Sequence, residues 1–272
     1  MEVKKHINFD NISLVYAVYG EGNKTIITLH GFGRDYQDFK FFENELKGYK
    51  VIGINLFFHG GSIYPKSNIP KQPLSKETWF KLFETLLQNE KISSFNLLSY
   101  SMGGKFAFCL LERFYSRINK AVFLAPDGIV INPWYKLMTN TQTGKVLSKW
   151  FGRSSFGIPQ MLKITTTLKV TKPTLKRFVE HNISSKEKRE KIYWVWQTFR
   201  EIKPNHEIIA KNLSKVDTEV FVFLGKFDVA IKDIYQKRLT HFYGDRVNVK
   251  VLPLGHNLFK ELLKPEFQKI WQ

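Results

Sequence analysis

A serine, an aspartate and a histidine stand where their side chains could work together as a nucleophile and its activating base. Ser101 lies in the string Ser-Tyr-Ser-Met-Gly-Gly at 99–104, between an apolar run and a helical pattern. A serine hydroxyl is a poor nucleophile until a base removes its proton. His256 follows a late apolar run and a glycine, and Asp228 lies 28 residues before it. The sequence predicts Ser101 as nucleophile, His256 as base and Asp228 as the acid that orients the base.

The string around Ser101 fits a sharp turn from a strand into a helix. Such a turn holds its serine at strained backbone angles, so the residues two positions before and after it must be small, as Ser99 and Gly103 are. The next backbone N–H, that of Met102, would stand at a helix N-terminus, where partial positive charge favours an oxyanion. The competing interpretation is that Ser101 only caps the helix.

These features resemble the α/β-hydrolase family, whose motif G-x-S-x-G has its first glycine replaced here by Ser99. The family order of serine, acid and histidine is kept. The resemblance implies a second oxyanion donor after the third strand, where His-Gly-Phe-Gly at 30–33 makes the N–H of Phe32 the candidate. His30 is then expected to fix this loop rather than to take part in catalysis.

Two parts of the resemblance leave alternatives open. Asp127, after the apolar run at 120–126, is the rival to Asp228, because some members of the family carry the acid on that earlier strand. The loop at 55–62 resembles the family's D-x-x-G-x-G-x-S turn, with Asn55 where Asp is usual and an altered glycine spacing. We interpret this loop as structural and expect His59 near the rim of the pocket.

The elements that would position these residues alternate along the chain. Apolar runs typical of strands occupy 12–20, 25–30, 50–56, 94–100, 120–126, 219–225 and 247–254, and helical patterns occupy 35–47, 76–90, 102–115, 231–243 and 257–271. Most central runs are continuously apolar, as in a parallel sheet that is covered on both faces. We predict an α/β fold with a doubly wound, mostly parallel eight-stranded sheet that begins with an antiparallel hairpin.

This alternation stops in the middle of the chain. Helical patterns follow one another there at 133–151, 158–170, 173–182 and 185–202. An all-helical insertion between two strands is typical of a lid over one end of a sheet. We therefore predict a core domain of 1–127 and 216–272 and a helical lid of 128–215.

The positive charge of the chain is concentrated in this predicted lid. The net charge is +18, and residues 128–215 hold 17 Lys and Arg against 5 Asp and Glu, a net +12. A charge of this size favours anionic partners, although lysines that are merely solvated would account for it too. The functional alternative is that aromatic residues of the lid roof an acyl pocket while its lysines attract anionic substrates, an acyl carrier or a membrane surface.

Composition excludes several other classes of protein. The 272 residues are 43% hydrophobic, which suits a packed globular chain. The one cysteine, Cys109, forms no disulfide within the chain, and no apolar run is long enough for a signal peptide or a membrane span, so we expect a cytoplasmic protein. Zinc-finger, RNA-recognition, phosphate-loop and metal-ligand spacings are absent from the sequence, and we expect no nucleic-acid partner, cofactor or metal.

The residues thus predict a serine hydrolase that cleaves an ester or thioester through an acyl-enzyme. Its expected substrate is a small molecule with an apolar acyl part, and the basic lid would suit an anionic one. Two alternatives stay open. The string Ser-Met-Gly-Gly is similar to that of carbon–carbon bond hydrolases and of a lyase in menaquinone synthesis, which act on small carboxylates. A lidded small-molecule binding protein would keep the triad but use it weakly.

Overall fold

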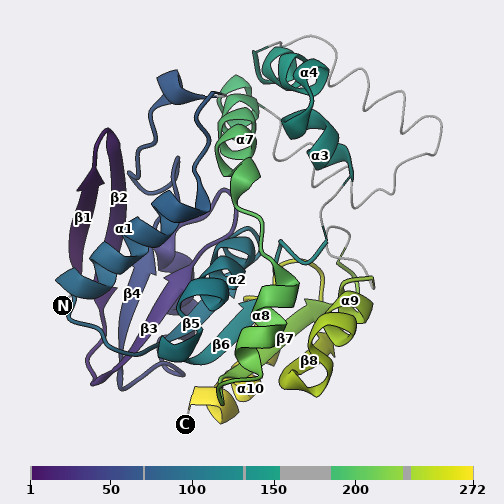
Figure 1. The fold of residues 1–272 in the computed structure, drawn as a ribbon. Helices are drawn as coiled ribbons and strands as arrows, with labels where there is room; N and C mark the ends of the chain where they lie inside the picture. The colour runs from purple at the N-terminus through teal and green to yellow at the C-terminus, as the bar shows by residue number, and fades with distance from the viewer. Residues whose placement is uncertain (1, 70, 131–132, 154–184, 229–233, 272) are drawn as a thin grey trace. The chain divides into compact units, whose positions relative to one another are not determined.

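The computed structural model describes residues 2–69, 71–130, 133–153, 185–228 and 234–271, which include one eight-stranded sheet (Figure 1). β1 pairs with β2 and β2 with β4 in antiparallel fashion, and the remaining neighbours are parallel. The predicted mostly parallel sheet with its antiparallel entry hairpin is therefore confirmed. In spatial order the strands are β1 (Val3–Phe9), β2 (Ile12–Tyr19), β4 (Tyr49–Ile54), β3 (Lys24–Leu29), β5 (Phe95–Tyr100), β6 (Ile118–Leu124), β7 (Glu219–Gly225) and β8 (Val247–Leu252).

Helices cover both faces of this sheet. On one face α1 (Lys76–Asn89) contacts α2 (Gly103–Arg113), which contacts α8 (His206–Leu213), which contacts α9 (Ile234–Tyr243). The ring of Phe123 in β6 stacks on Phe108 of α2 at 4.1 Å, so Phe123 points to this face. Phe123 pairs in register with Val222 of β7, so Val222 points to the same face. The next residue of β7, Phe223, points to the opposite face, because side chains alternate along a strand. There Phe223 meets Phe267 of α10 (Lys264–Trp271) at 6.3 Å.

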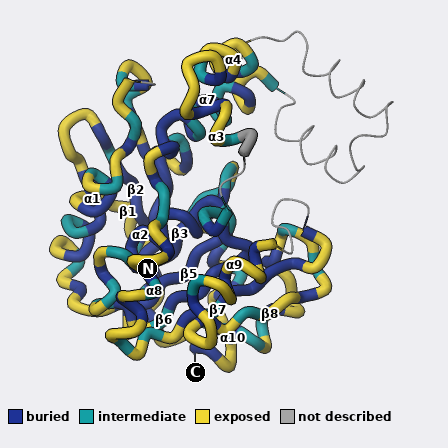
Figure 2. Tube along the Cα trace, turned by 45° about the vertical axis from the view of Figure 1, so that its right-hand side comes forward, coloured by how far each residue is buried: buried dark blue, intermediate teal, exposed yellow. Residues whose placement is uncertain are grey.

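The continuous apolar runs of the central strands follow from this double cover. All six residues of β5 are buried, as are the last four of β6 and of β7. The outermost strands β1 and β8 instead expose several residues. Figure 2 shows the dark, buried tube of the central strands beside the yellow, exposed surface of the helices. The end of β5, which leads into Ser101, thus lies in the buried centre of the sheet.

Three predicted helices are wrong in their extent. The pattern at 35–47 forms only a 3-10 helix, Tyr36–Phe42, whose N-cap Asp35 accepts a hydrogen bond from the N–H of Gln37. The pattern at 257–271 becomes α-helical only in α10, because Pro265 cannot donate an interior helical hydrogen bond and suits the first turn instead. The pattern at 133–151 is interrupted, because Thr141 caps a new helix by accepting from the N–H of Gly144 at 2.9 Å.

The chain divides into two compact units, of which the larger contains the sheet. The smaller comprises Pro65–Leu74 and Ile131–Glu201, so it differs from the predicted insertion of 128–215 at its end and includes a second segment. The difference at the end is α8, which belongs to the sheet unit. Asn212 of α8 donates its amide to the carbonyl of Glu112 in the α2 helix at 2.9 Å. The sequence pattern identified α8 as a helix but not the layer it joins.

The smaller unit is helical in its described residues. It contains α3 (Pro133–Asn140), α4 (Gln142–Arg153) and α7 (Lys186–Thr198). α4 contacts both α3 and α7. The predicted helices at 158–170 and 173–182 lie outside the described residues. None of the helices that the structure describes is long and apolar enough to cross a membrane.

Candidate active site

Ser101 sits on a strained turn between β5 and α2. Its φ is +49°, in the left-handed region that a residue with a side chain rarely adopts. Three backbone hydrogen bonds hold this conformation: the N–H of Ser101 donates to the carbonyl of Leu124 at 2.9 Å, and its own carbonyl accepts from Gly104 and Asp127, both at 2.8 Å. A strained conformation of this kind costs about 1–3 kcal/mol, which the surrounding packing must offset.

Small neighbours allow the turn to be this tight. A Cβ on Gly103 would lie 2.1 Å from the carbonyl oxygen of Leu29, so no larger residue fits there. A Cβ on Gly31 would lie 2.7 Å from the ring of Tyr100 and 3.2 Å from the Cβ of Ser101. The His-Gly-Phe-Gly loop after β3 therefore lies directly against the serine, as the sequence predicts.

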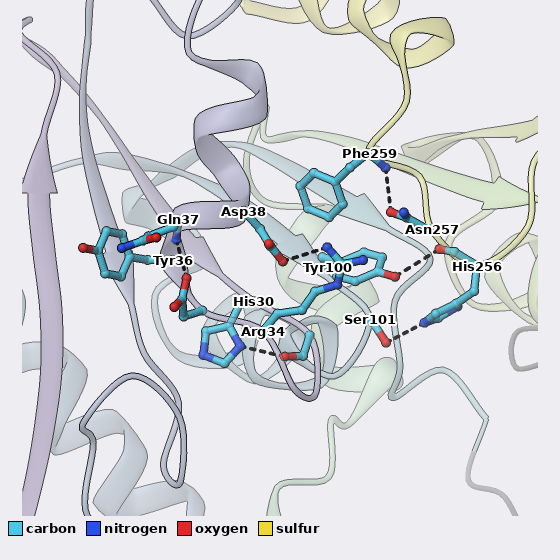
Figure 3. Close-up of polar contacts among 12 residues, drawn as sticks. His30, Arg34, Tyr36, Gln37, Asp38, Tyr100, Ser101, His256, Asn257 and Phe259 are labelled. Atoms are coloured by element: carbon cyan, nitrogen blue, oxygen red, sulfur yellow. Dashed lines mark hydrogen bonds and ion pairs between the residues drawn. The ribbon is translucent and has the colours of Figure 1, made fainter. Parts of the chain in front are cut away.

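The structure brings the three predicted triad residues into one hydrogen-bonded chain. Ser101 Oγ lies 2.8 Å from Nε2 of His256, and Nδ1 of His256 lies 2.7 Å from Oδ2 of Asp228 (Figure 3 shows the first of these contacts). The Asp228 side chain is fully buried, whereas that of His256 is 19% exposed. With the proton on Nδ1 held by the carboxylate, Nε2 is left as the acceptor for the serine proton. This arrangement can activate the hydroxyl as a nucleophile.

The rival acid, Asp127, makes different contacts. Its Oδ1 accepts from the N–H of Gly128 at 2.8 Å. Its charge also acts on Lys105, a buried residue of α2: burial lowers the pKa of the Lys105 ammonium group, and the Asp127 carboxylate opposes that shift. The carboxylate that the structure places on His256 Nδ1 is Asp228.

Two buried histidines support the loop that carries Phe32. Nδ1 of His30 donates to the carbonyl of Gly31 at 2.7 Å, and its Nε2 accepts from the N–H of Leu56 at 2.9 Å (Figure 3 shows the first contact). Nδ1 of His59 donates to Phe57 at 2.9 Å, and its Nε2 accepts from Gly33 at 2.9 Å. Each ring is therefore neutral, with the proton on Nδ1.

These contacts bear on the roles that the sequence predicts for His30 and His59. His30 fixes the loop, as the sequence predicts. His59 is buried and supports the same loop through its hydrogen bond with Gly33, and its place near a pocket rim stays a prediction. Asn55 is structural too, because its amide accepts from the N–H of Tyr36 at 3.1 Å and donates to Gly60 at 2.9 Å. The 55–62 loop thus holds the 31–33 loop in place.

Of the two predicted oxyanion donors, Met102 directly follows Ser101 in the chain, and Phe32 follows Gly31, which lies against Ser101. Met102 is the N-cap of α2, and the first N–H groups of a helix have no intrahelical acceptor. Phe32 belongs to the loop packed against Ser101, and its ring meets His59 edge-on at 5.6 Å. Both residues therefore lie on segments that adjoin the serine, one in the chain and one by packing. Their service as oxyanion donors stays a prediction.

Sequence reasoning missed a second layer of support around His256. The hydroxyl of Tyr100 donates to the carbonyl of His256 at 3.2 Å, and burial raises the pKa of Tyr100 to about 12, so this donor stays protonated (Figure 3). Arg34 lies over the ring of Tyr100 at 5.0 Å and is held by Asp38 at 2.8 Å. The signal was present, because Tyr100 is the aromatic residue directly before the nucleophile, but its partners are distant in sequence.

The side chains around Ser101 define the chemistry that the site can offer. Within the described parts of the chain, no group of three or more His, Cys, Asp or Glu side chains could hold a metal ion. The groups that the site offers are a nucleophile, a base, a carboxylate and backbone N–H donors. This set suits acyl transfer to a hydroxyl.

Comparison with known proteins identifies the fold. A family model described as alpha/beta hydrolase fold matches residues 24–260. Among curated proteins, none matches the sequence. Three similar solved structures are an α/β-hydrolase enzyme from a Medee basin deep-sea metagenome library (TM-score 0.68, 16% identity, 98% of this chain and 95% of that one), a thermophilic esterase from Thermogutta terrifontis (0.66, 18%, 99% and 96%) and the meta-cleavage product hydrolase CumD (0.63, 17%, 98% and 96%).

Proposed function

Because the chain belongs to the α/β-hydrolase fold family, we propose that it is a serine hydrolase that cleaves a carboxylic ester or thioester through an acyl-enzyme. The observation that carries the proposal is the unbroken chain of hydrogen bonds from Ser101 through His256 to the buried Asp228, at 2.8 and 2.7 Å. A serine that only capped a helix would have no need of a base at its hydroxyl or of a carboxylate behind that base.

The proposed first half-reaction forms the acyl-enzyme. Ser101 Oγ attacks the acyl carbon and passes its proton to Nε2 of His256, while Asp228 stabilises the imidazolium. The N–H groups of Phe32 and Met102 bind the oxyanion of the tetrahedral intermediate. The bond to the alcohol or thiol then breaks, and His256 gives its proton to that leaving group.

The second half-reaction repeats these roles with water. His256 takes a proton from a water molecule, the hydroxide attacks the acyl carbon, and the bond to Ser101 Oγ breaks with return of the proton. The products are a carboxylic acid and the regenerated serine. Water is the only co-substrate, and no step requires an oxidant or a reductant.

We also propose that the smaller unit acts as a lid over a substrate with an apolar acyl part. The support is its connectivity: the chain leaves the sheet unit after Val130 and returns at Ile202. Val130 lies six residues beyond the end of β6. β6 pairs with β5 in parallel, and both strands end at the sheet edge that carries Ser101. Ligands of open α/β sheets bind at this carboxyl edge.

A fluorophosphonate probe tests the proposed nucleophile. We expect labelling of the wild-type chain, none of Ser101→Ala, and retained labelling of Ser99→Ala, which removes a buried hydroxyl two residues away. Labelling that survives in Ser101→Ala would move the nucleophile elsewhere. Wild-type chain that takes no label from the probe would favour a lidded binding protein.

A second candidate is cleavage of a carbon–carbon bond. It is favoured by the string Ser-Met-Gly-Gly and by the similarity of the fold to a meta-cleavage product hydrolase. A panel of activated esters and thioesters assayed beside vinylogous diketone carboxylates separates the two. Turnover confined to the diketones would replace the ester proposal with this one.

A further inference from the structure

Helix α4 exposes its large apolar residues and buries its small ones. Val146 is 69% exposed, Trp150 51% and Leu147 39%. In an ordinary surface helix the large apolar residues face the protein. The buried residues of α4 are Gly144, Ser148 and Gly152.

Contacts within the smaller unit fix this orientation of α4. A Cβ on Gly152 would lie 3.1 Å from the Cβ of Tyr193 in α7, and one on Gly144 would lie 2.1 Å from the carbonyl of Leu137 in α3. Between them, Ser148 Oγ accepts from the side-chain amide of Gln197 at 3.0 Å. The buried side therefore has room only for small residues. Turning the helix over would force Val146 and Trp150 into it, so their exposure is part of the packing.

The exposed apolar residues of α4 lie on one side of the helix. At about 100° per residue, Val146, Leu147 and Trp150 fall within about 100° of arc on α4. Leu137 of α3 is 45% exposed and precedes the turn into α4. Trp150 also touches Phe151 edge-on at 5.2 Å. We call Leu137, Val146, Leu147 and Trp150 the α4 face.

Positive charge borders the α4 face, and the neighbouring sequence holds no carboxylate to balance it. Lys145, Lys149 and Arg153 lie on α4 itself, and Lys136 on α3. From 128 to 179 the sequence has nine Lys and Arg and no Asp or Glu. An exposed apolar face flanked by cations is typical of helices that lie in the interface of an anionic membrane.

We propose that the α4 face docks on the surface of an anionic lipid bilayer, with Trp150 and Val146 in the headgroup region and Lys145 and Lys149 on the lipid phosphates and carboxylates. A second copy of this chain fits less well, because its net charge of +18 would bring like charges together. Lysine stems can lie along the apolar layer while their ammonium groups reach the headgroups. This docking does not depend on the triad and goes beyond the proposed hydrolysis.

Vesicle co-sedimentation of the full chain tests this docking. We expect binding to phosphatidylcholine vesicles that contain phosphatidylserine and little binding to pure phosphatidylcholine. Val146→Ser with Trp150→Ser should weaken binding at least about tenfold. Lys145→Gln with Lys149→Gln should weaken it about 25-fold, since each basic residue near such a surface contributes about fivefold. Ser101→Ala should bind as the wild type does, which separates this test from that of hydrolysis.

Matched variants on the sheet unit serve as controls. Ile208→Ser with Leu262→Ser removes two apolar residues that are 45% and 50% exposed, and Lys211→Gln with Lys237→Gln removes two exposed lysines. Both should bind as the wild type does, and circular dichroism verifies that every variant is folded. Absent binding to the anionic vesicles, or equal losses in the α4 and control variants, would overturn the proposal. A dimer in sedimentation equilibrium that only the Val146/Trp150 variant dissolves would overturn it too, in favour of self-association.

Discussion

Replacing Asp228 by Asn tests which carboxylate orients the base. In the structure Oδ2 of Asp228 lies 2.7 Å from Nδ1 of His256 and its side chain is fully buried. An Asn at this position can donate its amide to Nδ1, which moves the ring proton to Nε2. The base then has no lone pair to accept the proton of Ser101, although the fold is unchanged.

The expected loss is large and specific to this carboxylate. Loss of the correct tautomer in a serine triad lowers kcat by about 10⁴-fold, or about 5 kcal/mol of transition-state stabilisation. Asp127→Asn should change kcat by less than about threefold, because the side-chain oxygen that accepts from Gly128 is kept. Its effect should appear in stability instead, because the buried Lys105 loses a nearby opposite charge.

The assay is steady-state hydrolysis of a nitrophenyl ester by the wild type and the two variants, with urea denaturation of each. We expect Asp228→Asn to be folded and nearly inactive, and Asp127→Asn to be active and less stable. The reverse ranking of the two activities would show that the acid belongs to the earlier strand, and the reasoning from the hydrogen bond at His256 would be refuted.

Three further results are expected. Gly103→Ala should lower the free energy of unfolding by about 2–3 kcal/mol in urea, since its methyl group meets the Leu29 carbonyl, whereas Gly255→Ala, whose methyl meets nothing within 4 Å, should not; equal values would contradict this. Burial lowers the pKa of the His206 imidazole below 6.5. The contribution of the neutral ring to stability is therefore present above pH 6.5 and is lost as the pH falls from 6.5 towards the lowered pKa. In that interval the free energy of unfolding should rise with pH, and His206→Gln should flatten the slope. Finally, kcat/KM for an anionic ester should fall by about threefold or more between low and high salt, and that of a neutral ester should not; parallel slopes would leave the basic residues as solvated surface.

The sheet, and the meeting of Ser101, Asp228 and His256 at its edge, could be predicted because their signals are local. Strands show as apolar runs, and Ser101, Asp228 and His256 each follow such a run, so the carboxyl edge of a parallel sheet gathers them. The small residues Ser99 and Gly103 also indicate the strained turn at Ser101. A single sequence suffices where each residue is placed by its own strand.

The support of the site could not be predicted, because it depends on pairs that are distant in sequence. Tyr100 donates to His256, 156 residues away, and His59 accepts from Gly33, 26 residues away. The residue type of His59 would also suit a pocket. Its burial and its hydrogen bond with Gly33 show that it supports a loop. A glycine-rich loop that contains a histidine can have the same sequence whether the histidine lines a pocket or supports the loop.

The extents of the helices, and the layer that α8 joins, could not be predicted for a different reason. Hydrophobic periodicity continues across Thr141 and into the segment before Pro265, where capping and the missing proline donor decide the helix starts. α8 has an apolar face whichever layer it joins, and its contact with Glu112 places it in the sheet unit. Periodicity reports that a face is buried but not against what.

The acyl-enzyme itself is the species on which the account depends. Mass spectrometry of the chain, quenched during turnover of a slowly deacylated ester, should show one added acyl group on the peptide that contains Ser101. The adduct should be absent from Ser101→Ala and present in Ser99→Ala. No adduct in the wild type during measurable turnover, or an adduct that persists in Ser101→Ala, would contradict the proposed mechanism.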